Sequence, residues 1–333
     1  MKHFWRKHWF YAGMAALAIL AFLLPEKTFL GTKPRILEFF NSSAGYLIAF
    51  IFVASGVRLE TRSLLSEIRN VKGILFGLIS IFLVAPIIAV VLSRVFSLSG
   101  DLYLGMALVA AMPTTIASGI IIVSLAGGNM ALALCLTVIS NLICPLTIPL
   151  VLRILGGRAI EVNLPVTAMM WNLCKVIVLP FLLGQIIRPF ARTFIEKIKT
   201  TLSITCQIIV LSFIFTSLWG SIDQIIALRL KIFMLTGMVL LLHVLMMVYN
   251  FFGAGMLGLN YDSRKTVTIV GSQKTLAAAF QVWNDVFGAS YIIMIPSVLH
   301  HLFQLIVDIP IANRWHGKKQ RIDSLRQEKK LLK

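Results

Sequence analysis

Long runs of apolar residues, separated by short polar segments, follow one another along almost the whole chain. A run of about 20 apolar residues is long enough to cross a bilayer as a helix. The runs do not alternate apolar and polar positions, as the strands of a membrane barrel would. The pattern predicts an all-α integral membrane protein with ten spans, at 8–24, 43–58, 72–95, 103–125, 130–153, 167–188, 203–220, 230–252, 264–284 and 289–313.

Composition agrees with this pattern, since 58% of the residues are hydrophobic and 13% are charged. A soluble protein has roughly 45–50% apolar and about 25% charged residues. The net charge of +18 would also suit a nucleic-acid-binding protein. The basic residues lie mostly between spans, however, where they indicate the cytoplasmic side of a membrane. We therefore expect a lipid bilayer as partner and no nucleic acid.

The basic residues also predict orientation. With the N-terminus inside, most Lys and Arg residues fall in the inner segments, so both termini are expected in the cytoplasm, at a plasma (inner) membrane. Leu24-Pro25-Glu26 follows the first apolar run instead of a small-residue cleavage site, which indicates a retained first helix. Residues 316–333 are predicted to be a basic cytoplasmic tail on the anionic leaflet.

The spans divide into two sets of five, and the fourth span of each set is interrupted. Because each set holds an odd number of spans, the second set enters the membrane from the opposite side. This is the inverted repeat that many secondary transporters use. The first repeat is predicted over residues 1–160 and the second over residues 161–315.

The first interruption is "AAMPTTIASG", residues 110–119. Pro113 has no N–H and clashes with the preceding turn, so the helix is expected to open there, with Gly119 as part of the break. Three hydroxyl residues follow Pro113, namely Thr114, Thr115 and Ser118. Carbonyls freed at membrane depth must find partners or line a polar cavity, which makes these residues candidates for a binding site.

The second interruption lies within "TVTIVGSQKTLAAAF", residues 266–280. It holds Gly271, Ser272, Gln273, Lys274 and Thr275. A charged side chain at mid-membrane costs roughly 2.5–3.5 kcal/mol on insertion scales. We expect the Lys274 ammonium to lie among opened carbonyls and the hydroxyls of Thr115, Ser118 and Ser272. The alternative is that Lys274 reaches an interface and has no function.

The last span, "IPSVLHHLFQLIVDIP" at 295–310, carries His300, Gln304 and Asp308 at intervals of four residues, on one helix face. Asp308 could pair with a cation, or the set could be a hydrogen-bonded stripe between helices. Asn141 in the fifth span could bond across helices or face a cavity. No metal or cofactor is expected, because His300 and Asp308 lack a third ligand and the four cysteines lie singly.

Three stretches carry a resemblance to a known family: "FVASGVRLETRSLLSEIRNVKGILFGLISIFLVAP" (52–86), "MPTTIASGIIIVSLAGGNMALALCLTVISNLICPL" (112–146) and "VGSQKTLA" (270–277). In their order, spacing and span count, the chain resembles the bile acid/sodium symporter family (the solute carrier family 10 type). It is more similar to the orphan seventh-member branch, with a Lys in the ninth-span break. The resemblance implies a panel of spans 1, 2, 6 and 7, and a core of spans 3–5 and 8–10 with crossed, discontinuous helices 4 and 9.

The resemblance also implies positions for two sodium sites. In the first, Ser118 and Thr137 match the family's ligands, but Gly119 and Ala133 stand where it has Asn and Ser. In the second, Gln273 matches, whereas Ile269 replaces an acidic residue and Ile81 replaces a Gln.

Both sodium sites have therefore lost ligands, and Lys274 follows Gln273 directly. A fixed ammonium in place of a removable cation is the simplest account, so sodium independence is expected. If Lys274 releases its proton during the cycle, it could couple protons, which makes the proton the favoured coupling ion over sodium.

We therefore predict a secondary transporter that moves a small organic, anionic solute by alternating access between panel and core. The alternative is a cation/proton antiporter or a membrane regulator linked to calcium homeostasis, although such antiporters usually need an Asp in the breaks. An enzyme is not expected, because neither a His-Glu-x-x-His nor a Gly-x-Ser-x-Gly motif is present.

Overall fold

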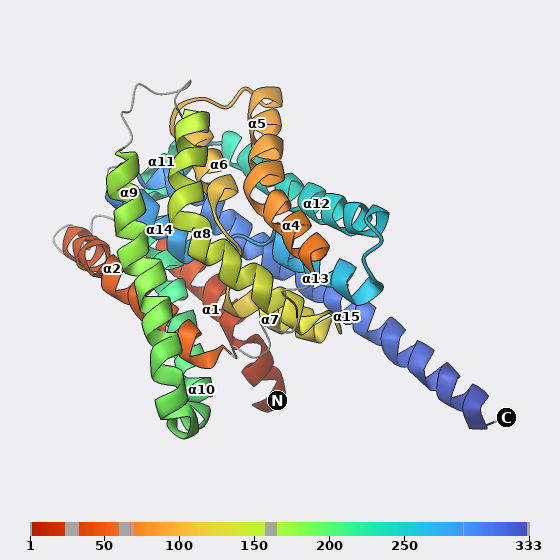
Figure 1. The fold of residues 1–333 in the computed structure, drawn as a ribbon. Helices are drawn as coiled ribbons and strands as arrows, with labels where there is room; N and C mark the ends of the chain where they lie inside the picture. The colour runs from red at the N-terminus through yellow and green to blue at the C-terminus, as the bar shows by residue number, and fades with distance from the viewer. Residues whose placement is uncertain are drawn as a thin grey trace.

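The computed structural model describes residues 2–23, 33–59, 67, 70–156, 165–288 and 290–331, and these form helices joined by short loops (Figure 1). The first half contains α1 (Lys2–Leu23), α2 (Lys33–Arg58), α4 (Val71–Ile79), the π-helix η2 (Ser80–Val84), α5 (Ala85–Val95), α6 (Gly100–Ala111), α7 (Ala117–Leu125) and α8 (Met130–Gly156). The second half contains α9 (Val166–Leu173), the π-helix η3 (Cys174–Val178), α10 (Leu179–Gly220), α11 (Ile222–Leu228), α12 (Lys231–Met256), α13 (Tyr261–Ser272), α14 (Leu276–Val282), the π-helix η4 (Trp283–Phe287), the 3-10 helix η5 (Tyr291–Met294) and α15 (Ile295–Leu331).

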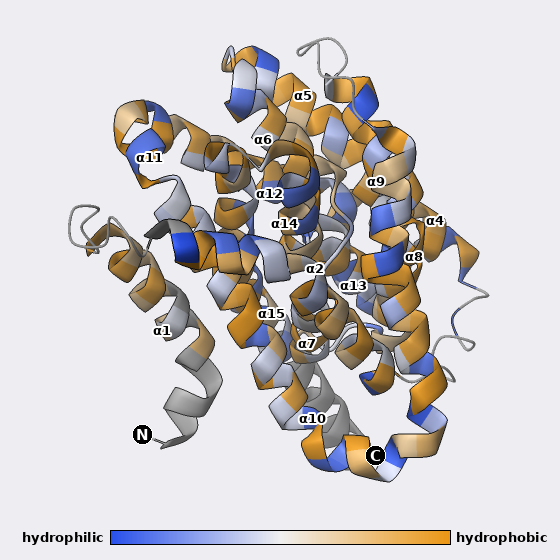
Figure 2. Cartoon of the chain, turned by 90° about the vertical axis from the view of Figure 1, so that its left-hand side faces the viewer, coloured by the Kyte–Doolittle hydropathy of each residue, from blue (hydrophilic) through white to orange (hydrophobic). Residues whose placement is uncertain are grey.

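Six helical segments of the described chain are long and apolar enough to cross a membrane. One of them, Val166–Gly220, has 55 residues, more than twice the roughly 20 that one crossing needs. The interrupted helices 103–125 and 264–284 are not among the six, because each is divided into short pieces. Large apolar side chains such as Leu83, Ile186 and Phe252 are exposed, and Figure 2 shows hydrophobic residues along most of the helices. These features are those of a multi-pass membrane protein.

The second span is longer than its pattern predicted. It was expected at 43–58, but α2 begins ten residues earlier, at Lys33. Polar residues in its first turns explain the error, because they break the apolar run without breaking the helix. Asn41 finds a partner there, since its Nδ2 donates to the hydroxyl of Tyr291 at 2.9 Å.

The sixth and seventh spans, expected at 167–188 and 203–220, belong to two helices that meet directly at a kink. α10 runs through the polar segment between them, with a kink at Ala191, whose φ of −114° and ψ of 15° are not helical. Pro189 lies two residues before this kink and removes a backbone donor, which explains the change of direction.

Two glycines bring α2 and α10 into backbone contact. A Cβ on Gly56 would lie 2.3 Å from the carbonyl oxygen of Phe181, and one on Gly184 would lie 2.4 Å from that of Val53. Gln185 fixes the same contact, because its Nε2 donates to the carbonyl of Leu59 at 3.1 Å. Small residues that allow close approach are the usual means of packing membrane helices.

The C-terminal tail continues the last span. α15 extends without interruption to Leu331 and projects away from the other helices in Figure 1. The predicted tail at 316–333 is therefore the end of a long helix over the described residues. The boundary between the two predicted repeats, at residue 160, and residues 24–32, 60–66 and 68–69 lie outside the described part of the chain.

Candidate functional site

The two interrupted helices meet at their breaks. The chain leaves helical geometry at 112–116, between α6 and α7, and at 273–275, between α13 and α14. The N–H of Thr275 donates to the carbonyl oxygen of Pro113 at 2.9 Å, so one break bonds directly to the other. We call these two segments together the crossing.

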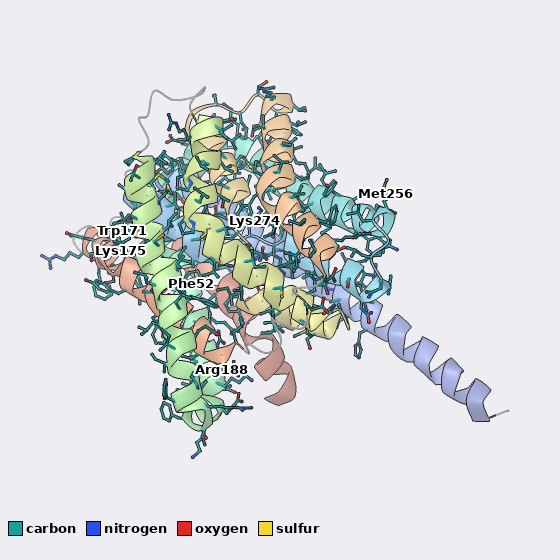
Figure 3. The ribbon with its side chains drawn as sticks, viewed as in Figure 1. Phe52, Trp171, Lys175, Arg188, Met256 and Lys274 are labelled. Atoms are coloured by element: carbon teal, nitrogen blue, oxygen red, sulfur yellow. The ribbon has the colours of Figure 1, made fainter. Side chains whose placement is uncertain are left out.

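The side chain of Lys274 points into a cage of carbonyl oxygens. Its Nζ donates to the carbonyls of Ile81 at 2.7 Å, Ala110 at 2.9 Å and Met112 at 2.9 Å. The residue is 2% exposed, and Figure 3 shows it inside the helix bundle. Snorkelling to an interface, the alternative considered for this lysine, does not describe this geometry.

Two prolines leave these carbonyls free. In η2 the N–H of Ala85 donates to Ser80 and not to Ile81. The following residue is Pro86, which has no N–H, so the Ile81 carbonyl is available to another donor. The carbonyls of Ala110 and Met112 lie at the end of α6, which stops before Pro113 and leaves its last carbonyls without helical partners.

The hydroxyls expected beside the ammonium form other hydrogen bonds. Thr115 Oγ1 donates to Gln273 Oε1 at 2.8 Å and lies 2.6 Å from Ser118 Oγ. Ser272 Oγ donates to the carbonyl of Thr268 at 2.8 Å. The expectation that these hydroxyls would hold the lysine is therefore wrong. The backbone carbonyls have stronger dipoles than the hydroxyls, and among the described residues no other donor competes with the ammonium for the carbonyls of Ile81, Ala110 and Met112.

Asp308 is held from two sides beside the crossing. Its Oδ2 accepts from Gln273 Nε2 at 2.6 Å, and its Oδ1 lies 2.9 Å from Nε2 of His243, with both His243 and Asp308 fully buried. His243 Nδ1 lies 3.3 Å from the carbonyl of Ser272, which can only accept. Nδ1 can therefore donate to this carbonyl, while Nε2 faces the carboxyl group of Asp308.

His243 was not among the predicted site residues, because a lone His in an apolar helix is usually explained by packing. Its partner lies 65 residues away in the sequence, and no local pattern connects the two. Two further polar residues of α15 contact this network. Gln304 Oε1 accepts from the backbone N–H of Lys274 at 2.9 Å, and the His300 ring packs edge-on against His243 at 5.1 Å.

Asn141 bonds across helices, which settles one of the alternatives left open. Its Nδ2 donates to the carbonyls of Thr114 at 3.0 Å and Thr137 at 2.8 Å, and so ties α8 to the break after α6. Among the described residues, Oδ1 of Asn141 and the hydroxyls of Thr114 and Thr137 have no hydrogen-bond partner. These buried oxygens are all uncharged.

The two glycines predicted as parts of the breaks lie inside helices instead. Gly119 belongs to α7 and Gly271 to α13. A Cβ on Gly119 would lie 3.0 Å from Gln273 Oε1, and one on Gly271 would lie 2.7 Å from Asn250 Nδ2. Their small size permits close packing beside the crossing, whereas Pro113 marks the first interruption itself.

A cavity of about 400 Å³ opens beside the crossing. Residues of α2 and α10 line one side, and residues of α7, α14 and α15 line the other. Thr115, Ser118 and Thr275 give it a polar end at the crossing, and most of its other lining residues are apolar. Within the described residues, no group of three or more His, Cys, Asp or Glu side chains is placed to hold a metal ion.

Three relatives with transporter names match most of the chain. "Probable sodium/metabolite cotransporter BASS4, chloroplastic" of Oryza sativa subsp. indica is 30% identical over 287 residues, covering 81% of this chain and 68% of the relative. "Sodium/bile acid cotransporter 7" of Xenopus tropicalis is 24% identical over 340 residues, covering 98% of this chain and 97% of the relative. The protein of the same name from Danio rerio is 23% identical over 329 residues, covering 95% and 96%.

A family profile matches most of the chain. The sequence profile of the SBF-like CPA transporter family matches residues 8–317, which include both breaks and every helix that lines the cavity. Its members are transporters and not enzymes. This chain is a secondary transporter, and it belongs to the SBF-like CPA transporter family.

Proposed function

We propose that the protein carries a small organic anion across the membrane by alternating access, with the cavity beside the crossing as its binding site. The proposed architecture has ten crossings in two inverted five-helix repeats, 1–160 and 161–315. Spans 1, 2, 6 and 7 form a panel, and spans 3–5 and 8–10 form a core. This division is supported by the lining of the cavity, because α2 and α10 belong to the panel and α7, α14 and α15 belong to the core.

We propose further that the ammonium of Lys274 permanently replaces a bound sodium ion. The single observation that carries this proposal is the cage of three carbonyl oxygens around Nζ. Oxygen atoms from the third span and from the fourth-span break surround a positive charge, as they would surround a metal cation. The charge is attached to the ninth-span break, so it holds all three segments together without a mobile ion. Transport is then independent of sodium.

A thermal-shift experiment on the purified protein tests this replacement. The wild type is expected to unfold at the same temperature in sodium, lithium and potassium chloride at equal ionic strength. Lys274→Ala opens the cage and is expected to be less stable and to gain a sodium-specific stabilisation. A sodium-specific shift of the wild type would contradict the proposal, as would a variant that responds equally to all three cations.

The buried pair of His243 and Asp308 favours proton coupling as a second candidate function. The two side chains are in contact beside the crossing, and Gln273 links Asp308 to Thr115 at the cavity. The groups that face this pair are the amide of Gln273 and the His300 ring, with Lys274 and His301 nearby on the same network. A change in the proton content of the pair would reorient Gln273 and thereby alter the cavity.

Proteoliposomes with a pH-sensitive dye inside test this candidate. A wild-type protein that moves protons with its solute is expected to acidify or alkalise the lumen, and Asp308→Asn is expected to abolish that signal. Asp308→Glu is the matched variant, because it keeps the carboxyl group and should retain part of the signal. Equal proton movement in the wild type and in Asp308→Asn would exclude the pair as the coupling site.

The relatives also support placing the chain in the seventh-member branch of the bile acid/sodium symporters. Cotransporter 7 of Xenopus tropicalis matches 98% of this chain and BASS4 matches 81%, whereas identity is higher to BASS4, at 30% against 24%; the proposal therefore rests on the coverage and on the Lys in the ninth-span break. We propose a plasma (inner) membrane location with both termini in the cytoplasm, as the distribution of basic residues indicates. Cysteine labelling of single-cysteine variants at each terminus, from either side of sealed vesicles, tests the orientation.

A further inference from the structure

Among the described residues that line the cavity beside the crossing, one carries a formal charge. Arg58, the last residue of α2, lines it together with mostly apolar side chains such as Phe52, Leu276 and Ile309. No Asp, Glu or Lys belongs to the lining formed by the described residues. A cation beside apolar surface is costly unless an anion pairs with it, so this arrangement favours an anionic occupant.

The guanidinium of Arg58 has donors to spare. Its Nε donates to the carbonyl of Ala54, one turn earlier, at 2.9 Å. Within the described chain, the two terminal amino groups form neither an ion pair nor another hydrogen bond. Two such groups lie in one plane and bind both oxygens of a carboxylate at once, which a lysine ammonium cannot do in the same fixed geometry.

The other end of the cavity presents uncharged donors and acceptors. Because Gln304 Oε1 accepts from the N–H of Lys274, its Nε2 faces His301 Nδ1 at 2.9 Å and must donate to it. His301 then carries its proton on Nε2. The His301 ring and the hydroxyls of Thr115 and Ser118, which line this end, suit a neutral polar group such as a hydroxyl.

We propose that Arg58 binds the acid group of the solute, and that the solute is a carboxylate on an apolar body. Its neutral polar group faces Thr115, Ser118 and His301, so its negative charge lies at the Arg58 end and not at Lys274. The cavity volume of about 400 Å³ lies near the lower end of the usual range for ligand pockets, which restricts the body to a small one. This inference rests on the proposed use of the cavity as the transport site, but not on the role of Lys274.

Binding of a matched pair of probes tests the role of Arg58. The probes are 1-naphthaleneacetate and its neutral amide, 1-naphthaleneacetamide, and the readout is the thermal stability of the purified full-length protein against probe concentration. The wild type is expected to bind the carboxylate about tenfold more tightly than the amide, as a charge-assisted hydrogen bond implies. Arg58→Gln should remove this preference while leaving amide binding unchanged, and Arg58→Lys should keep part of it.

Arg94→Gln is the control, because Arg94 is exposed at the end of α5 and does not line the cavity. It should retain the wild-type preference. A wild type without preference for the carboxylate, or an Arg58→Gln variant that keeps the preference, would overturn the assignment. Amide binding reports that each variant is folded, and Arg58→Lys provides the test if Arg58→Gln does not fold. No sodium is needed, so a failure here is separate from a failure of the Lys274 proposal.

Discussion

Two buried lysines, Lys265 and Lys274, lie nine residues apart and make similar contacts, each at the C-terminal end of one of the two half-helices of the fourth span. Lys265 Nζ donates to the carbonyls of Ala126 at 3.0 Å and Gly127 at 2.6 Å, just beyond the end of α7. Lys274 does the same for the last carbonyls of α6. Both lysines therefore place a positive charge at the negative end of a half-helix, where the helix dipole favours it.

The two sites differ in what balances the charge. Lys265 forms an ion pair with Asp262 at 2.8 Å, and the carboxylate is 46% exposed. Lys274 forms no ion pair with any carboxylate among the described residues, and its charge faces carbonyl dipoles alone. The comparison separates a capping lysine, which pairs with a partly exposed carboxylate, from a lysine whose partners among the described residues are carbonyl groups alone. We attribute a role in transport to the second.

The largest expected effect is that of Lys274→Met, which keeps the side-chain length and removes the charge. It leaves three buried carbonyls without donors, and each unsatisfied buried group costs about 1–3 kcal/mol. We expect the free energy of unfolding to fall by at least about 3 kcal/mol, and solute uptake into proteoliposomes to be lost. Chemical denaturation and the uptake assay measure the two effects. Uptake at the wild-type rate would show that the interior charge has no part in transport.

An intermediate effect is expected for Lys265→Met. It also removes donors from two carbonyls, but Gly127 is only partly buried and water can replace the lysine there. We expect a loss of stability of about 1–2 kcal/mol and uptake close to that of the wild type. Loss of uptake as complete as in Lys274→Met would remove the distinction between the two lysines.

The smallest effect is expected for Asp262→Asn. The carboxylate is partly exposed, so its pair with Lys265 contributes less than about 1 kcal/mol after screening by solvent. The difference in unfolding temperature between variant and wild type should shrink further at 1 M salt, where the screening length is about 3 Å. A difference that stays constant with salt would show that Asp262 acts through a contact other than this ion pair.

Some features of the crossing and of the surroundings of Lys274 can be predicted from the sequence, and others cannot. The break at Pro113 and the burial of Lys274 were predicted, because a proline and a charge within an apolar run have few structural solutions. The acceptor at Ile81 was not predicted. It depends on a π-helical turn in the third span, for which Pro86 is the only local signal. The start of α2 was misplaced, since polar first turns look like a loop when their tertiary partners are unknown.

The pairing of His243 with Asp308 was also beyond sequence reasoning. The two residues come from α12 and α15, and only the packing of these helices brings them together. The face of α15 that carries Gln304 and Asp308 follows from their spacing of four, but the spacing does not say which helix lies opposite. Local chemistry was therefore predictable, while contacts between distant segments required the fold.

The glycine contact between α2 and α10 limits how the carrier can move. At Gly56 and Gly184 the two backbones approach so closely that neither helix has room to slide or roll against the other. A motion that exposes the cavity to the other side of the membrane must therefore move α2 and this part of α10 together, as one rigid unit. Arg58 lies at the end of α2 and belongs to this rigid unit, whereas Thr115 and Ser118 line the cavity from the fourth-span break and α7. A solute bound to both sets of residues would bridge the cavity, so the length of the solute would determine how far the two sides can approach each other.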